Sequence, residues 1–131
     1  MENASISVID SSVFVAFYRD IDSHNREAIA IMQELAAAGV SMIVHPYVVQ
    51  ETATVLAYSS GLDIAKRFLS DLAEASNAVV PVVAIQHDMQ LYTVCDVKIS
   101  FTDCALIGLA KEMNARLITF DRQMLAYARR L

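Results

Sequence analysis

The chain has 131 residues and a formal net charge of −5, with 56% hydrophobic and 19% charged residues. This length fits a single folded domain over residues 1–131, and the composition excludes a disordered tail. The acidic balance argues against a general nucleic-acid coat protein, which is usually basic. It does not exclude an enzyme that binds phosphate through metal ions.

The sequence lacks the patterns of a secreted protein, a membrane protein, a cysteine-rich zinc protein and a nucleotide-binding loop. The first residues lack the basic and apolar segments of a signal peptide, and the apolar run Val79–Ile85 is too short to cross a bilayer. Cys95 and Cys104 are too few for a cysteine-rich zinc site. No glycine-rich phosphate-binding motif occurs. We therefore expect a cytoplasmic protein that contacts no membrane and keeps both thiols reduced.

Apolar patterns alternate between the periods of a strand and a helix along the chain. In chain order they predict a strand at residues 6–9, a helix at 25–38, a strand at 41–44, helices at 46–59 and 62–75, a strand at 79–85, helices at 86–95 and 102–114, a strand at 116–120 and a helix at 122–131. Pro81 indicates an edge position for the third strand. Strands alternating with helices predict an α/β fold whose mainly parallel sheet is covered on both faces.

Four carboxylates occupy positions where such a fold gathers ligands. Asp10 directly follows the first strand in VIDSSVF, and Asp121 directly follows the last strand in LITF; ligands of open parallel sheets bind outside the carboxyl ends of the strands. Glu51 and Asp103 fall on or beside the apolar stripes of their own helices. An acid facing the core is costly unless it is paired, so we expect the four side chains to converge.

Each acid also has an ordinary explanation. Asp10 could cap a turn, Glu51 could reach solvent, Asp103 suits a first helical turn, and Asp121 could cap the last helix. Convergence favours a shared role, because two carboxylates about 5 Å apart repel by about 3 kcal/mol at an effective dielectric near 20. A divalent cation removes this repulsion, and an all-oxygen ligand set favours Mg²⁺ or Mn²⁺ over Zn²⁺.

At these residues the sequence resembles the PIN domain family, and within it the VapC-like toxins of toxin–antitoxin pairs. The segments VIDSSVFVAF, PYVVQETATVL and SFTDCALIGLAKEMNARLITFDRQM resemble the family's acidic motifs in order and spacing. Cys104 and Met124 stand where alanine and phenylalanine are common. The resemblance implies a three-layer α/β/α sandwich, metal-dependent endoribonuclease activity on RNA, a homodimer, and an antitoxin partner that blocks the site.

The expected roles follow from these motifs. Asp10, Glu51, Asp103 and Asp121 are predicted to be the catalytic metal ligands. Ser11, Ser12 and Ser100 are either hydroxyls that orient the carboxylates or ordinary turn and cap residues. Arg122 either contacts substrate phosphate or is a solvated residue at a helix start. The histidines lack metal-ligand spacing and are predicted to be surface or capping residues: His24, His45 and His87.

Three other functions remain to be weighed. A PIN fold without catalysis could serve as a scaffold, although the four intact acids argue against this. A DNA nuclease needs the same acids, so only the resemblance favours RNA. A phosphoacceptor signalling domain is disfavoured, because Asp10 has no adjacent acid and no suitably placed lysine follows a strand.

Overall fold

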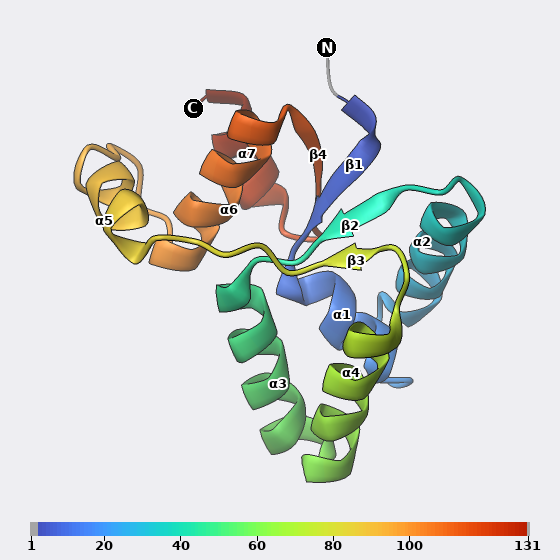
Figure 1. Ribbon diagram of the computed structural model, residues 1–131. Coiled ribbons are helices and arrows are strands. Elements are labelled where there is room, and N and C mark those ends of the chain that lie inside the picture. Colours follow the sequence, from blue (N-terminus) through green and yellow to red (C-terminus); the bar gives the residue numbers. More distant parts are fainter. Residues whose placement is uncertain (1–2, 131) are drawn as a thin grey trace.

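The computed structural model describes residues 3–130 (Figure 1). Its elements are β1 (Asn3–Ile9), α1 (Ser11–Tyr18), α2 (Asn25–Ala37), β2 (Ser41–Ile43), α3 (Pro46–Ser60), α4 (Leu62–Glu74), β3 (Ala78–Val79), α5 (Ile85–Thr93), α6 (Phe101–Met113), β4 (Ala115–Ile118) and α7 (Arg122–Arg130). Residues 1, 2 and 131, which belong to the predicted domain and, for 131, to the predicted last helix, lie outside the described residues.

The four described strands form one sheet in the order β3-β2-β1-β4, and every pairing is parallel. From β1 the chain moves outward to β2 and β3, and it then returns to place β4 on the opposite side of β1. The direction of winding therefore reverses beside β1. In open parallel sheets, ligands bind at this reversal, outside the carboxyl ends of the strands.

Helices cover both faces of this sheet, which confirms the predicted three-layer α/β/α sandwich. Helix α1 packs on both α2 and α3, and α3 packs on α4, while α6 packs on β1 and β4 and also contacts α5. Figure 1 shows these two groups of helices on opposite sides of the sheet. Strand β1 is central, and its residues Ser7, Val8 and Ile9 are buried. A strand covered on both faces needs a continuous buried run rather than an alternating one.

The predicted strand at residues 79–85 is wrong over most of its length. Strand β3 comprises only Ala78–Val79, and Ile85 is already the first residue of α5. Pro81 has no backbone N–H to donate to a sheet, and the Val82 side chain is fully exposed. The run is apolar but lies largely outside the sheet at its edge, so hydrophobicity alone gave the wrong element.

The first strand begins three residues earlier than predicted, at Asn3, and the other predicted elements agree with the structure to within about two residues at each end, as is usual for boundaries. Helix α1 is an addition, because only the resemblance indicated a helix start after Asp10. Cys95 and Cys104 are free thiols. Across residues 3–130, no helix combines the length and the hydrophobicity needed to span a membrane.

Candidate active site

Asp10 lies at the point where β1 ends and α1 begins, and it is buried although it is an acid. Its backbone N–H donates to the Ile118 carbonyl at 2.9 Å, which extends the β1–β4 pairing by one residue. The hydroxyls of Ser12 and Thr119 both donate to its Oδ2 atom, at 2.8 and 2.7 Å. Within residues 3–130 no hydrogen bond is made to Oδ1, so the carboxylate is held firmly by one oxygen and keeps the other available.

Thr119 connects two of the four acids. While its hydroxyl donates to Asp10, the same oxygen accepts the backbone N–H of Asp121 at 3.0 Å. Thr119 was not among the predicted site residues. The available signal was a hydroxyl two residues before Asp121, where such side chains often hold a turn.

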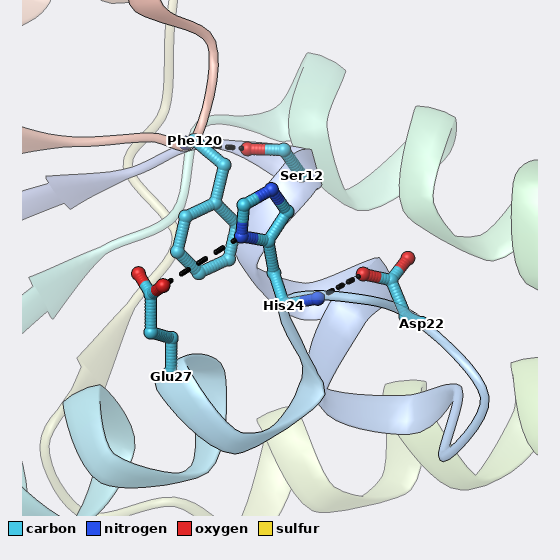
Figure 2. A network of polar contacts seen from close by, with 5 residues as sticks. All are labelled: Ser12, Asp22, His24, Glu27 and Phe120. Atoms are coloured by element: carbon cyan, nitrogen blue, oxygen red, sulfur yellow. Dashed lines mark hydrogen bonds and ion pairs between the residues drawn. The ribbon is translucent and has the colours of Figure 1, made fainter.

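Ser12, which lies just after the end of β1, also contacts the segment that follows β4. Its hydroxyl oxygen accepts the backbone N–H of Phe120 at 3.1 Å (Figure 2). The Phe120 ring in turn stacks on the exposed His24 ring, with centroids 4.4 Å apart and planes 11° from parallel. Figure 2 shows this stack joining the segment after β4 to the start of α2, where the His24 N–H donates to the Asp22 carboxylate. The predicted surface position of His24 is confirmed.

Asp121 is exposed and caps α7. Its Oδ1 atom accepts the backbone N–H groups of Gln123 and Met124, at 3.0 and 3.1 Å. The ordinary explanation for this acid, helix capping, therefore holds in the structure. The cap uses Oδ1 and also fixes the direction of the carboxylate, which leaves Oδ2 available.

Asp103 gives the clearest electrostatic sign of a shared site. It lies half-buried in the first turn of α6, where its backbone N–H donates to the Ser100 hydroxyl at 3.0 Å. Burial, and then the charge of Asp10, raise the pKa of Asp103 from 3.8 to about 6. The charges of Asp121 and Glu51 add smaller increases, while a hydrogen bond with Ser100 opposes them. The other three acids therefore all act on Asp103.

Glu51 lies beside the apolar stripe of α3, one of the two positions that its spacing allowed, and it does not face the core. The buried side of α3 is formed by Val48, Thr52 and Leu56, spaced four residues apart, whereas Glu51 is exposed beside them. The spacing of three and seven residues had pointed to the edge of the stripe and not to its centre. An exposed position next to the other acids suits a ligand that must reach a hydrated ion.

The donor set fits a hard divalent cation. In the described part of the chain no three histidine, cysteine or acidic side chains already stand close enough to hold a metal ion. The raised pKa of Asp103 nevertheless shows that its carboxylate lies within the field of three others. Carboxylate oxygens are the ligands of Mg²⁺ and Mn²⁺, and a cation would remove the repulsion that burial makes costly.

The remaining predicted residues have mixed outcomes. Ser100 caps α6 and Ser12 orients Asp10, as described above. Ser11 is the first residue of α1 and is half-buried. Arg122 is the first residue of α7 and is exposed. His45 caps α3, because its Nδ1 atom accepts the Tyr47 N–H at 3.0 Å. His45 is also buried at 1% exposure, so the predicted surface alternative is wrong for this residue.

Comparison with known proteins identifies this arrangement. A PIN domain model matches residues 7–130, which is nearly the whole chain. The chain belongs to the PIN domain family. This confirms the family resemblance of the acidic motifs, and the PIN-like sandwich follows from it. Among curated protein sequences, none is significantly similar to the chain.

A solved structure supports the same fold. The crystal structure of Mycobacterium tuberculosis VapC20, a sarcin–ricin loop cleaving toxin, is similar to this PIN domain with a TM-score of 0.76 at 18% sequence identity. The similarity covers 92% of this chain and 94% of VapC20. At this identity it establishes a shared fold and no more.

Proposed function

We propose that this PIN domain is a metal-dependent endoribonuclease in which Asp10, Glu51, Asp103 and Asp121 together hold one or two Mg²⁺ or Mn²⁺ ions. The observation that carries the proposal is the electrostatic coupling of Asp103 to the other three acids at the carboxyl ends of β1 and β4. Bound ions of this kind supply an activated water and stabilise the leaving oxygen of a phosphodiester.

The chain's own residues have distinct roles in this proposal. Asp10 and Asp103, which are the more buried acids, serve as direct ligands, while the exposed Glu51 and Asp121 act partly through water. Ser12 and Thr119 keep Asp10 oriented, as side chains around a metal ligand commonly do. Ser100 does the same for Asp103. Ser11 is a further orienting hydroxyl, and Arg122 contacts a substrate phosphate.

We further propose that the protein is the toxin of a type II toxin–antitoxin pair and works as a homodimer in the cytoplasm. Its support is the family membership together with the fold shared with the toxin VapC20. The antitoxin would block the acidic site. Light scattering at micromolar concentration tests the dimer, and a monodisperse monomer would contradict it. Growth arrest on expression, relieved by the gene encoded next to it, tests the toxin assignment.

The central test is cleavage of RNA by matched variants. Wild-type protein, Asp10→Asn and Asp63→Asn are purified in parallel and incubated with single-stranded RNA and Mn²⁺. Asp63 is an acid in the first turn of α4 and does not belong to the site. We expect wild type and Asp63→Asn to cut and Asp10→Asn or added EDTA to abolish cutting. Undiminished cutting by folded Asp10→Asn would refute the assignment.

The same preparations separate the two alternative functions. A DNA strand of the same sequence tests a DNA nuclease, since metal chemistry at phosphorus needs no 2′-hydroxyl. A scaffold without catalysis predicts no cleavage of either strand and no binding of Mn²⁺. A metal that binds only the folded state must raise the melting temperature, so thermal stabilisation by Mn²⁺ separates a metal site from a plain scaffold.

A further inference from the structure

An open groove with a volume of about 460 Å³ is lined in part by Glu51, one of the four acids. It is bounded by the beginnings of α3, α5 and α6, with Tyr47 and Phe101 as its aromatic residues. Glu51 belongs both to this groove and to the proposed metal site, and Thr102 in the groove directly precedes Asp103. The groove is therefore continuous with the site, and its size is within the range of small-molecule pockets.

The two aromatic rings are held in place before any ligand arrives. Their centroids lie 5.9 Å apart with the planes inclined by 46°. The Tyr47 hydroxyl donates to the buried Asp88 carboxylate at 2.7 Å, and the His45 ring packs 4.1 Å from the Tyr47 ring. The Tyr92 ring packs 5.5 Å from that of Phe101. Rings fixed in this way lose little freedom when a flat ligand packs against them.

Beyond the two rings, the groove is lined by the apolar side chain of Ile85 and by several polar side chains. Gln50, Thr54 and Thr102 line it, and within residues 3–130 their side chains make no hydrogen bond to the protein. Its charged lining residue is Glu51, and no lysine or arginine of the described chain lines it. A phosphate would be repelled here, whereas a neutral planar ring with hydrogen-bonding edges matches both the aromatic residues and the polar rim.

We propose that this groove binds an unpaired nucleobase of the substrate strand, next to the phosphodiester that is cut. The proposal rests on the proposed nuclease function and adds the side chains of this chain that would contact a base. Bases within a duplex are stacked and paired, so a protein that packs a base against aromatic side chains selects unpaired nucleotides. Gln50, with an amide that both donates and accepts, is placed to contact the edge of the base.

The test measures binding separately from cleavage. In an Asp10→Asn background, the affinity for a short fluorescent single-stranded RNA is compared between Phe101→Leu, which removes the ring but keeps an apolar side chain, and Phe101→Tyr, which keeps the ring. Tyr58→Leu is the matched control, because Tyr58 is an aromatic residue of α3 that is 90% exposed and lies outside the groove. Melting temperatures verify that each variant is folded.

We expect Phe101→Leu to weaken RNA binding by roughly 5- to 150-fold, the loss of one base–aromatic stack. Phe101→Tyr and Tyr58→Leu should bind like the parent, and a paired RNA hairpin stem should bind more weakly than the single strand. RNA containing 4-thiouridine should crosslink to the peptides that carry Tyr47 or Phe101.

Each outcome is informative about one proposal at a time. Cleavage by wild type together with unchanged binding by folded Phe101→Leu would overturn the base site and leave the nuclease intact. Binding that depends on Phe101 without any cleavage would support the base site and overturn the nuclease. Loss of antitoxin binding in Phe101→Leu with RNA binding unchanged would reassign the groove to a protein segment, and absence of RNA binding by the parent would overturn the base site.

Discussion

Replacing Asp103 with asparagine is expected to stabilise the metal-free protein and to abolish its stabilisation by Mn²⁺. In the folded chain the neighbouring acids and burial raise the pKa of Asp103 from 3.8 to about 6. Between these pH values the folded chain holds a proton that the unfolded chain has already released. Stability therefore falls as the pH rises through this window, and the full cost of the ionised carboxylate is present above pH 6. Asparagine removes that charge.

The magnitude follows from the same two values. The interval between 3.8 and about 6 corresponds to an upper bound of about 3 kcal/mol. Solvent screening at a half-buried side chain reduces it, and the loss of a negative charge in the first turn of α6 offsets up to about 1 kcal/mol. We expect a net gain of roughly 1 to 2 kcal/mol at neutral pH, which corresponds to roughly 3 to 8 °C in melting temperature.

The assay is thermal unfolding of wild type, Asp103→Asn and Asp63→Asn at pH 4 and pH 7.5, in EDTA and in Mn²⁺. Asp63 is also a first-turn acid, so its variant measures the helix-end effect without the repulsion. The gain of Asp103→Asn should appear in EDTA at pH 7.5 and vanish at pH 4. At one hundred times the dissociation constant, Mn²⁺ should add about 2.7 kcal/mol to wild type and far less to the variant. A less stable Asp103→Asn protein in EDTA at pH 7.5, or equal stabilisation by Mn²⁺, would refute the electrostatic argument.

Three further changes test single contacts. Thr119→Val removes the hydroxyl that contacts both Asp10 and Asp121, and it should lower kcat/KM and Mn²⁺ affinity roughly 10- to 100-fold. Thr119→Ser should restore both, and an unaffected valine variant would contradict the positioning role. Thr52→Val should raise the free energy of unfolding, measured by urea denaturation, by about 1 kcal/mol, because the fully buried Thr52 hydroxyl has no hydrogen-bond partner within residues 3–130. A lower free energy of unfolding in this variant would show that the hydroxyl is not an unsatisfied group. Asp88→Ala should cost roughly 1 to 3 kcal/mol by leaving the Tyr47 hydroxyl without its acceptor, and Asp88→Asn should recover part of that loss.

Part of the site could be predicted because topology brings distant residues together. Asp10 and Asp121 are separated by more than one hundred residues, but Asp10 directly follows β1 and Asp121 lies three residues after the end of β4. Once the strands are parallel neighbours, their carboxyl ends must lie at one edge of the sheet. Asp103 was predictable from its helical spacing, which placed it beside the buried residues of α6. These inferences need only the period of the elements and the rule for parallel sheets.

The remainder depends on contacts that spacing does not encode. Thr119 becomes important only because β4 pairs with β1 in the register that brings its hydroxyl to Asp10. Glu51 is exposed because of which face of α3 packs on the neighbouring helices. The sequence does not decide this, since two faces of the helix that differ by one residue have similar apolar patterns. The valines around Pro81 resemble a strand in composition, but an edge position leaves them outside the sheet.

The charge of the site constrains how RNA can be held. Within residues 3–130, the two ion pairs both join a histidine to an acid, and no lysine or arginine is paired with a carboxylate of the site. The acids are thus not neutralised by the protein, and the chain as a whole has a net charge of −5. Phosphate affinity in nucleic-acid binding normally comes from lysine and arginine contacts that release counterions. Under the proposed function, one or two divalent ions would offset the charge of the four acids so that the backbone can approach, while the aromatic groove would recognise the base by contacts that need no charge. RNA binding should therefore strengthen with Mn²⁺ in wild type, whereas any residual binding in EDTA should depend mainly on Phe101.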